Sequence, residues 1–313
     1  MKKSIKNNTF SANPLDRAGN LRRNNNWIKS MASNKDAKFL PFFQLKPAIK
    51  HNNDRIELAW LKRDKAKNFG LRIANSIFLG LDHHKNPLFA FPTKIRLKIS
   101  EINKKNIFFD ELRDIAALIS NENASILAQA RSMINWNQQN SFCSNCGSTT
   151  KIKEGGYVKT CSKKDCQIDH FPRTDPVVIM LVYYKNFCLL GRQTYFPKNL
   201  FSVLAGFMEP GESIEEAVAR EVIEETAIKV KNVQYHSSQP WPYPSSLMIG
   251  CMAEAVNKKI IIDKKEINEA IWVSKKEIKS LLNKKDTISR NRVLIKLPPP
   301  MAIAHQLLKS WSN

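Results

Sequence analysis

The segment GFMEPGESIEEAVAREVIEETAI, residues 206–228, constrains the fold of this chain more than any other part of the sequence. Its apolar residues recur at helical spacing over about 213–226. Glu221, Glu224 and Glu225 stand at i, i+3 and i+4, so they share one face of that helix. The apolar stripe on the opposite face consists of Ile214, Ala217, Val218 and Val222. We therefore expect an amphipathic helix that buries one face and presents three carboxylates on the other.

Three neighbouring carboxylates repel one another, so their clustering indicates a cationic partner. A hard divalent cation such as Mg²⁺ binds carboxylate oxygens while it keeps water and phosphate ligands. Arg220 can hold the carboxylates in place through bidentate hydrogen bonds. An acidic helix face alone is commonly just solvated surface. The glycine-rich loop before the helix and the spacing of Gly206, Glu212 and Arg220 favour a metal site over that interpretation.

A second metal site is predicted by four cysteines within 24 residues: Cys143, Cys146, Cys161 and Cys166. The pattern Cys-x2-Cys followed by Cys-x4-Cys provides four thiolates, and Zn²⁺ prefers such a closed tetrahedron. No coordination position stays open, so we expect a structural and not a catalytic zinc. A chance cluster or a redox pair is the weaker interpretation. Cys188 and Cys251 lie in apolar stretches and are expected to be small buried hydrophobic residues.

The rest of the chain divides by composition and periodicity. Residues 1–35 are polar, basic and rich in Asn, and we expect them to be disordered. Residues 36–138 are predicted to form a small strand-rich domain with apolar runs at 39–43, 73–81, 88–91 and 95–99. Helical spacing follows over 110–138, interrupted at 121–123. The zinc ribbon is assigned to 139–170 and the catalytic domain to 171–313.

The catalytic domain shows strands interspersed with helices, which is typical of an α/β or α+β sandwich. Strands are expected at 177–184, 187–192, 228–237, 247–256 and 269–273. Helices are expected at 275–284 and 301–311. Ser274 and Glu277 form a predicted capping box at the start of the first of these.

The net charge of +22 is unevenly distributed. Residues 1–70 hold sixteen Lys and Arg against five Asp and Glu, whereas residues 171–230 hold six against eight. A basic periphery can attract polyanions, or it can be solvated surface alone. No apolar run approaches the roughly 18 residues that cross a bilayer, and the first residues lack the apolar core of a signal peptide. We expect a cytoplasmic protein without a membrane partner.

The segment at 206–228 resembles the Nudix box, G-x5-E-x7-R-E-U-x-E-E-x-G-U, where U is a bulky apolar residue. One position departs from it, because Ala227 stands where the motif has Gly. Near a helix end that Gly would adopt positive φ, where Ala costs about 1 kcal/mol. This departure from the motif leaves every carboxylate in place, so activity is expected.

A second resemblance narrows the family. Residues 238–246 form a proline-fixed segment with two aromatic rings, which suits stacking on a flat ring, although such a segment can also be an ordinary turn. It resembles the SQPWPFPxS motif of NADH pyrophosphatases, with Tyr243 where that motif has Phe. The preceding zinc ribbon and N-terminal domain also match that family. The resemblance is specific over 142–306, loose over 36–141 and absent over 1–35.

The resemblance implies a Nudix α/β/α sandwich that hydrolyses the pyrophosphate of NAD(H) to AMP and nicotinamide mononucleotide. It implies Mg²⁺ or Mn²⁺ as the catalytic cation, beside the structural Zn²⁺. The implied ligands are the carbonyl of Ala205 and the carboxylates of Glu221, Glu224, Glu225 and Glu266. Glu225 is expected to be the most essential for activity, as base or as ligand, and Arg220 supports the set. The cation would polarise the phosphates and lower the pKa of an attacking water.

The resemblance also implies substrate contacts. These are Phe171, Phe207, Gln239, Pro240, Trp241, Pro242, Tyr243, Pro244, Ser245, Ser246 and Ala304. Phe171 stands where the family usually has Tyr, so one hydroxyl contact would be missing. Family members commonly form homodimers in which a loop of one subunit completes the site of the other.

Two alternatives stay open. The same chemistry could remove an NAD cap from RNA 5′ ends, with the basic segments binding the RNA body. A protein of another class, a non-catalytic zinc-ribbon module that binds nucleic acid, would retain an idle Nudix domain. The intact acidic motif argues against the second of these.

Overall fold

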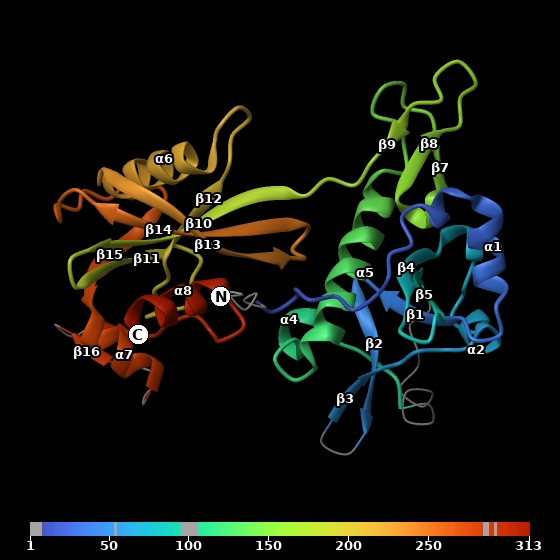
Figure 1. Cartoon of the computed structure of the whole chain (residues 1–313), viewed down its shortest axis with the longest axis horizontal. Helices are drawn as coiled ribbons and strands as arrows, with labels where there is room; N and C mark the ends of the chain where they lie inside the picture. The colour runs from blue at the N-terminus through green and yellow to red at the C-terminus, as the bar shows by residue number, and fades with distance from the viewer. Residues whose placement is uncertain (1–7, 53–54, 95–105, 284–287, 291–292) are drawn as a thin grey trace, which may run out of the picture. The chain divides into compact units, whose positions relative to one another are not determined.

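The computed structural model describes residues 8–52, 55–94, 106–283, 288–290 and 293–313 (Figure 1). The chain forms two compact units. One comprises Asp175–Pro240 and Ser246–Asn313 together with Asn8 and Thr9, and we call it the catalytic unit. The other comprises Phe10–Thr174 and Trp241–Ser245, and we call it the N-terminal unit. Among the described residues, no helix is both long and apolar enough to span a membrane.

The catalytic unit is built on a mixed sheet in the order β13-β14-β10-β11-β15, with β12 paired to β10. Its strands are β10 (Asp175–Tyr184), β11 (Phe187–Gln193), β12 (Leu204–Phe207), β13 (Val230–Trp241), β14 (Ser246–Ala255) and β15 (Ile267–Ser274). Strand β10 runs parallel to β14 and antiparallel to β11 and β12. A separate hairpin pairs β16 (Ile288–Arg290) with β17 (Val293–Ile295).

Helices cover both faces of this sheet, which confirms the predicted sandwich (Figure 1). Alternate side chains of β10 point to opposite faces, as strand geometry requires. Val178 and Met180 pack in the core beneath α6 (Ile214–Thr226). Ile179 and Leu181 pack in the core with α7 (Lys275–Asn283) and α8 (Ile303–Ser312). Because both faces are covered, β10 is nearly continuously apolar.

Two helices of the catalytic unit begin at a capping box. Ser213 caps α6, and its side chain accepts a hydrogen bond from the backbone N–H of Glu216 in a full capping box. The predicted box at the next helix is also present, because Glu277 accepts hydrogen bonds from Ser274 while its N–H donates to the Ser274 hydroxyl. Each box satisfies N–H groups that the helix itself leaves unpaired.

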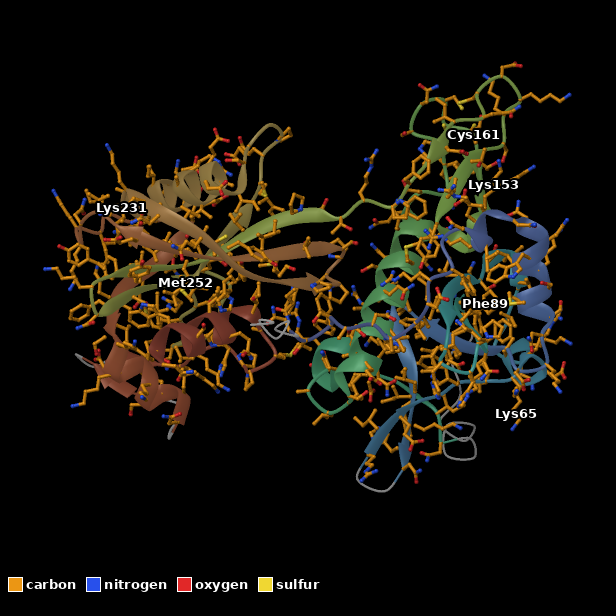
Figure 2. All side chains as sticks on the ribbon, in the orientation of Figure 1. Lys65, Phe89, Lys153, Cys161, Lys231 and Met252 are labelled. Carbon is orange, nitrogen blue, oxygen red and sulfur yellow. The ribbon has the colours of Figure 1, made fainter. Side chains whose placement is uncertain are left out.

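The N-terminal unit contains a second sheet in the order β3-β2-β1-β5-β4, with β6 paired to β2. Its strands are β1 (Lys38–Phe43), β2 (Lys46–Asn52), β3 (Arg55–Leu58), β4 (Ile77–Leu81), β5 (Pro87–Thr93) and β6 (Phe108–Phe109). Its helices are α1 (Asn25–Ser33), α2 (Arg63–Lys67), α4 (Leu112–Ile115) and α5 (Asn121–Gln139). In its core, Phe89, which is labelled in Figure 2, packs against Phe39 and Phe78. The expected strand at 95–99 lies outside the described residues.

The zinc ribbon of the N-terminal unit is a three-stranded antiparallel sheet, β7-β8-β9 (Figure 1). Its strands are β7 (Thr150–Lys153), β8 (Val158–Cys161) and β9 (Asp169–His170). The turn between β7 and β8 passes through Gly155 and Gly156, both at positive φ. A Cβ at Gly156 would stand 2.5 Å from the Cδ1 atom of Ile77, so this close approach to β4 requires glycine.

The expectation of disorder over 1–35 was wrong for the residues that the structure describes there. Helix α1 forms within this polar stretch because the Asn24 side chain accepts hydrogen bonds from the N–H groups of Asn26 and Trp27. Phe10 and Ala32 are buried. Residues 1–7 lie outside the described residues.

Candidate active site

The site is built on α6 and the neighbouring strand β12, where the Glu221 carboxylate lies over Gly206. A Cβ at position 206 would stand 1.9 Å from the Glu221 Cδ atom and about as close to both carboxylate oxygens. Any side chain at 206 would therefore displace the carboxylate. The glycine that opens the motif is explained by this contact, not by an unusual backbone angle.

The side chain of Arg220, which is 23% exposed, joins three of the four motif carboxylates into one network. Its guanidinium donates to both oxygens of Glu212, at 2.5 and 2.9 Å, and to Glu221 and Glu224 at 2.9 Å each. It also donates to the carbonyl oxygen of Phe207 on β12 at 2.9 Å. The planar guanidinium matches such a set of acceptors, which an ammonium group could not. Arg220 therefore fixes α6 against β12.

Glu212 supports this network from the loop before α6. Hydrogen bonds from Arg220, and then from the backbone N–H of Glu209, hold the pKa of the Glu212 carboxyl down at about 2. Glu212 therefore stays ionised, and the pKa of the Arg220 guanidinium is raised above its usual value. Sequence reasoning placed Glu212 in the motif without a role. The structure gives it the role of positioning Arg220.

Glu225 is the unusual member of the set. Its residue is only 3% exposed, and its Oε2 atom has no hydrogen-bond partner among the described residues. Burial, and then the charges of Glu221, Glu266 and Glu224, raise the pKa of the Glu225 carboxyl to about 8. Burial also raises the pKa of Glu221, although Arg220 opposes the shift. A buried carboxylate without a partner is costly unless a cation or a proton neutralises it.

Glu266 reaches the same site from a different part of the chain. The loop after β14 returns along the end of α6, where the Ile261 and Asp263 N–H groups donate to the carbonyls of Thr226 and Glu225. Glu266 follows in this loop, is exposed, and raises the pKa values of Glu221 and Glu225 through its charge. The structure thus brings this distant glutamate to the carboxylates of α6.

These residues fit a divalent cation. The orphaned buried oxygen of Glu225 and the raised pKa of that residue both describe a carboxylate that lacks a positive partner. Ala205 lies beside Gly206 on β12, opposite Ile179 of β10. Oxygen donors of this kind are what Mg²⁺ and Mn²⁺ prefer. Ala205, Arg220, Glu221, Glu224, Glu225 and Glu266 all belong to the catalytic unit.

The four cysteines gather at the tip of the zinc ribbon. Their Sγ atoms all lie within 4.8 Å of one another, with 3.5 Å between Cys146 and Cys161 and 3.8 Å between Cys143 and Cys166. A zinc tetrahedron with Zn–S bonds of about 2.3 Å places its sulfurs about 3.8 Å apart, so the cluster fits Zn²⁺. Hydrogen bonds from Ser148 lower the pKa of the Cys146 thiol to about 6, which favours the thiolate that binds metal. Cys161 is labelled in Figure 2.

The two phenylalanines predicted to stack on substrate lie in different units. Phe207 ends β12 beside the carboxylates, and its residue is 61% exposed. Phe171 follows β9 in the N-terminal unit and is also exposed. Each ring is therefore open to a ligand.

The predicted substrate segment 238–246 is divided between the units. Gln239 lies in the part that belongs to the catalytic unit and is fully buried. Its amide donates to the carbonyls of Thr9 and Met301 and accepts from the N–H of Ile303. Ser246 and Ala304 are buried as well. Gln239 thus forms hydrogen bonds within the protein, and Ala304 packs in its core. The contacts of these two residues with substrate stay a prediction.

Trp241–Ser245 belong to the N-terminal unit, with Pro242 to Ser245 forming the turn between β13 and β14. The ring centroids of Trp241 and Tyr243 are 5.4 Å apart, and Phe10 packs edge-on against both rings. The guanidinium groups of Arg113 and Arg131 each stand 4.6 Å from the Tyr243 ring centroid. Sequence reasoning missed these arginines because no local pattern links residues more than 100 positions apart.

The comparisons with known proteins agree with this arrangement. Three family models match: a NADH pyrophosphatase-like rudimentary NUDIX domain at 36–136, a NADH pyrophosphatase zinc ribbon domain at 138–171 and a NUDIX domain at 173–297. The chain is 37% identical to the NAD-capped RNA hydrolase NUDT12 of Pongo abelii, over 97% of this chain and 73% of that protein. The chain belongs to the NADH pyrophosphatase family of Nudix hydrolases.

The matches to two further relatives cover most of the length of those proteins. The enzyme is 33% identical to the NAD(P)H pyrophosphatase NUDT13, mitochondrial, of Mus musculus, over 88% of this chain and 84% of that protein. It is 30% identical to an NAD-capped RNA hydrolase of Schizosaccharomyces pombe, over 97% of this chain and 94% of that protein. The enzyme is thus a Nudix hydrolase that uses a divalent cation and carries a zinc ribbon.

The one departure from the Nudix box is strained as the sequence predicted. Ala227 caps α6 in the left-handed region, with φ 56° and ψ 20°. Replacing Ala227 by Gly should relieve this strain and stabilise the protein by about 1 kcal/mol. Thermal denaturation should show a melting temperature raised by roughly 2–4 °C. Ala219→Gly, a substitution inside the same helix, is the control and should destabilise the protein by a similar amount. An unchanged or lowered melting temperature for Ala227→Gly would contradict the strain.

Proposed function

We propose that the enzyme hydrolyses the diphosphate bond of NAD(H) and releases AMP and nicotinamide mononucleotide. The observation that carries the chemistry is the buried, unpartnered Glu225 carboxylate beside Glu221 and Glu266. The assignment to a nicotinamide dinucleotide is supported by the family models, since two of the three describe domains of NADH pyrophosphatases.

In this proposal, Glu221, Glu225 and Glu266 hold Mg²⁺ or Mn²⁺ with the Ala205 carbonyl, and Glu224 is a further ligand. When bound, the cation neutralises charge on the diphosphate and makes a bound water more acidic. Arg220 keeps Glu221 and Glu224 in position through the hydrogen bonds described above. Burial removes Glu225 from the water that would otherwise solvate its charge, so a bound cation is what would keep this carboxyl group ionised.

The exposed ring of Phe207 is proposed to stack on a flat ring of the dinucleotide, as are Phe171, Trp241 and Tyr243. Pro240, Pro242 and Pro244 fix the segment that carries the last two rings. In this proposal, the hydroxyl groups of Ser245 and Ser246 form hydrogen bonds with the dinucleotide. We also propose a cytoplasmic homodimer, which the resemblance to the family supports and which light scattering of the purified enzyme would test.

A second candidate substrate is RNA that carries an NAD cap. Two of the relatives named above are NAD-capped RNA hydrolases. The net charge of +22 favours binding of a polyanion. The alternative of a non-catalytic nucleic-acid module is not supported, because Glu212, Arg220, Glu221, Glu224 and Glu225 are all present. Arg220 connects the first three of these glutamates in one network.

Turnover of NADH, NAD⁺, ADP-ribose and NAD-capped RNA at two salt concentrations tests both substrates. We expect kcat/KM to be highest for NADH and nearly independent of salt. If the basic surface binds RNA through about three phosphates, kcat/KM for capped RNA should fall roughly 20-fold between 50 and 200 mM salt. Equal salt dependence for NADH and capped RNA would remove the support for an RNA-binding surface. Faster cleavage of ADP-ribose than of NADH would contradict the assignment to NAD(H).

A further inference from the structure

The N-terminal unit holds a cavity that the proposed reaction does not use. Its volume is about 190 Å³, and the lining residues all belong to that unit. They come from the N-terminal sheet, from the last turns of α5 and from the zinc ribbon, together with Asn75 before β4 and Ser141 after α5. Ile77, Ile134 and Ile152 supply apolar surface, and Asn137 and Lys159 supply polar groups. None of the lining residues is acidic.

Lys159 is unusual because a lysine rarely lies inside a protein without an acidic partner. It lies on β8 and is only 5% exposed. Its Nζ atom donates to the carbonyl oxygen of Asn137 at 2.8 Å, in the last turn of α5, where the helix dipole favours a cation. An ammonium group has three N–H donors, and this carbonyl takes one of them. Among the described residues, no carboxylate forms an ion pair with it.

Asn137 supplies a second polar group that lacks a partner. The residue is 7% exposed, and its Nδ2 atom donates to the carbonyls of Met133 and Gly156 at 2.9 Å each. Because both partners of this atom are carbonyl oxygens, it must be the nitrogen, and the remaining atom Oδ1 is the amide oxygen. That oxygen is buried and has no hydrogen-bond partner among the described residues. Buried polar atoms are nearly always paired, so an orphan in the wall of a cavity indicates a ligand.

We propose that this cavity binds a small organic carboxylate that has an apolar ring and one hydroxyl or amino donor. Lys159 would bind the carboxylate, and Asn137 Oδ1 would accept a hydrogen bond from the donor. The isoleucine side chains would contact the ring. A dry apolar cavity of about 150 Å³ accommodates benzene, so 190 Å³ suits a benzene-sized ring with a carboxyl group. The site is independent of the proposed hydrolysis.

Titration of the full-length, zinc-loaded protein with 4-hydroxybenzoate tests this site by calorimetry and ligand-observed NMR. We expect saturable binding with a Kd of about 1 mM or tighter. Two analogues each lack one feature: 4-hydroxybenzamide lacks the charge, and benzoate lacks the hydroxyl donor. A third compound, inorganic phosphate, is an anion without the ring and without the carboxyl group. Each should bind at least fivefold more weakly. Equal binding of the amide, or tighter binding of phosphate, would overturn the proposed chemistry.

Three variants locate the binding. Lys159→Met keeps the apolar stem but removes the ammonium group, and it should weaken binding at least tenfold. Ile152→Trp fills the cavity and leaves Lys159 in place, so it should abolish binding even if the first variant does not fold. Lys151→Met is the matched control on β7, because Lys151 is exposed and does not line the cavity. It should bind within twofold of the unmodified protein. No saturable binding at about 10 mM, or binding that survives Ile152→Trp, would refute the proposal.

Discussion

Replacing Glu225 by Gln lowers kcat for NADH by a factor of about 10³ or more. The substitution removes a charged oxygen donor while it keeps the volume of the side chain, and a cation at such a site contributes several kcal/mol to catalysis. Steady-state kinetics in saturating Mg²⁺ would measure the loss. Glu215→Gln is the matched control, because it makes the same chemical change at an exposed position of the same helix. It should retain activity within about twofold, and unchanged turnover of Glu225→Gln would contradict the assigned role.

Although Glu225→Gln should lower activity, it should raise the stability of the metal-free protein. Burial, with the charges of neighbouring glutamates, raises the pKa of Glu225 from 4.5 to about 8, so the folded state keeps a proton that the unfolded chain releases. Stability without metal therefore falls as pH rises from about 4.5 to 8. Gln cannot ionise and avoids this loss. At pH 8, with zinc bound and without Mg²⁺ or Mn²⁺, Glu225→Gln should melt roughly 5 °C higher than the unmodified protein, and at pH 4.5 the two should melt alike.

Mg²⁺ provides the internal control for this comparison. Adding Mg²⁺ at pH 8 should raise the melting temperature of the unmodified protein, because the Glu225 carboxylate binds the cation. It should leave the melting temperature of Glu225→Gln nearly unchanged, because Gln has no charged oxygen at this position. A metal-free Glu225→Gln protein that is less stable than the unmodified one at pH 8 would mean that the buried carboxylate has another partner.

The second large effect is expected at the cysteine cluster. Cys161→Ala should lose the bound zinc and, with it, the folded zinc ribbon, since structural zinc contributes roughly 10–16 kcal/mol to folding in zinc-finger peptides. Metal analysis should find one zinc per chain in the unmodified protein and much less in the variant. Its melting temperature should fall by well over 10 °C, or the protein should become insoluble.

Cys251→Ala is the control for this loss. Cys251 is a fully buried thiol in the sandwich core, distant in sequence from the cluster. Its replacement should cost some stability but leave the zinc content unchanged. Full zinc content in Cys161→Ala would show that Cys161 is not a ligand.

Features that depend on neighbouring residues could be predicted from the sequence. Helix α6 was predicted because its glutamates and apolar residues repeat with helical period, and the structure adds the Ser213 cap. The strand over Val177 to Val182 was recognisable because both of its faces are buried. Asn121 to Asn123 were interpreted as a break, but they form the first turn of α5, which Ser120 caps. Asn is a weak helix former yet is tolerated in a first turn.

Features that depend on distant residues could not be predicted. The burial of Gln239 requires carbonyl oxygens at Thr9 and Met301, which no local pattern connects to it. Phe10 belongs to a stretch that composition alone marks as disordered, yet it packs against Trp241 and Tyr243. The position of the Nudix glycine was known from its motif, but its reason, the Glu221 carboxylate above its Cα, appears only in three dimensions.

The most direct test of the proposed function is an analysis of the products that the purified enzyme forms from NADH. With Mg²⁺ or Mn²⁺, equimolar AMP and reduced nicotinamide mononucleotide should accumulate, without orthophosphate and without free nicotinamide. Chelator should stop the reaction, and Glu225→Gln should show almost none. Release of orthophosphate or nicotinamide, or no turnover with either cation, would contradict hydrolysis of the NAD(H) diphosphate at this site.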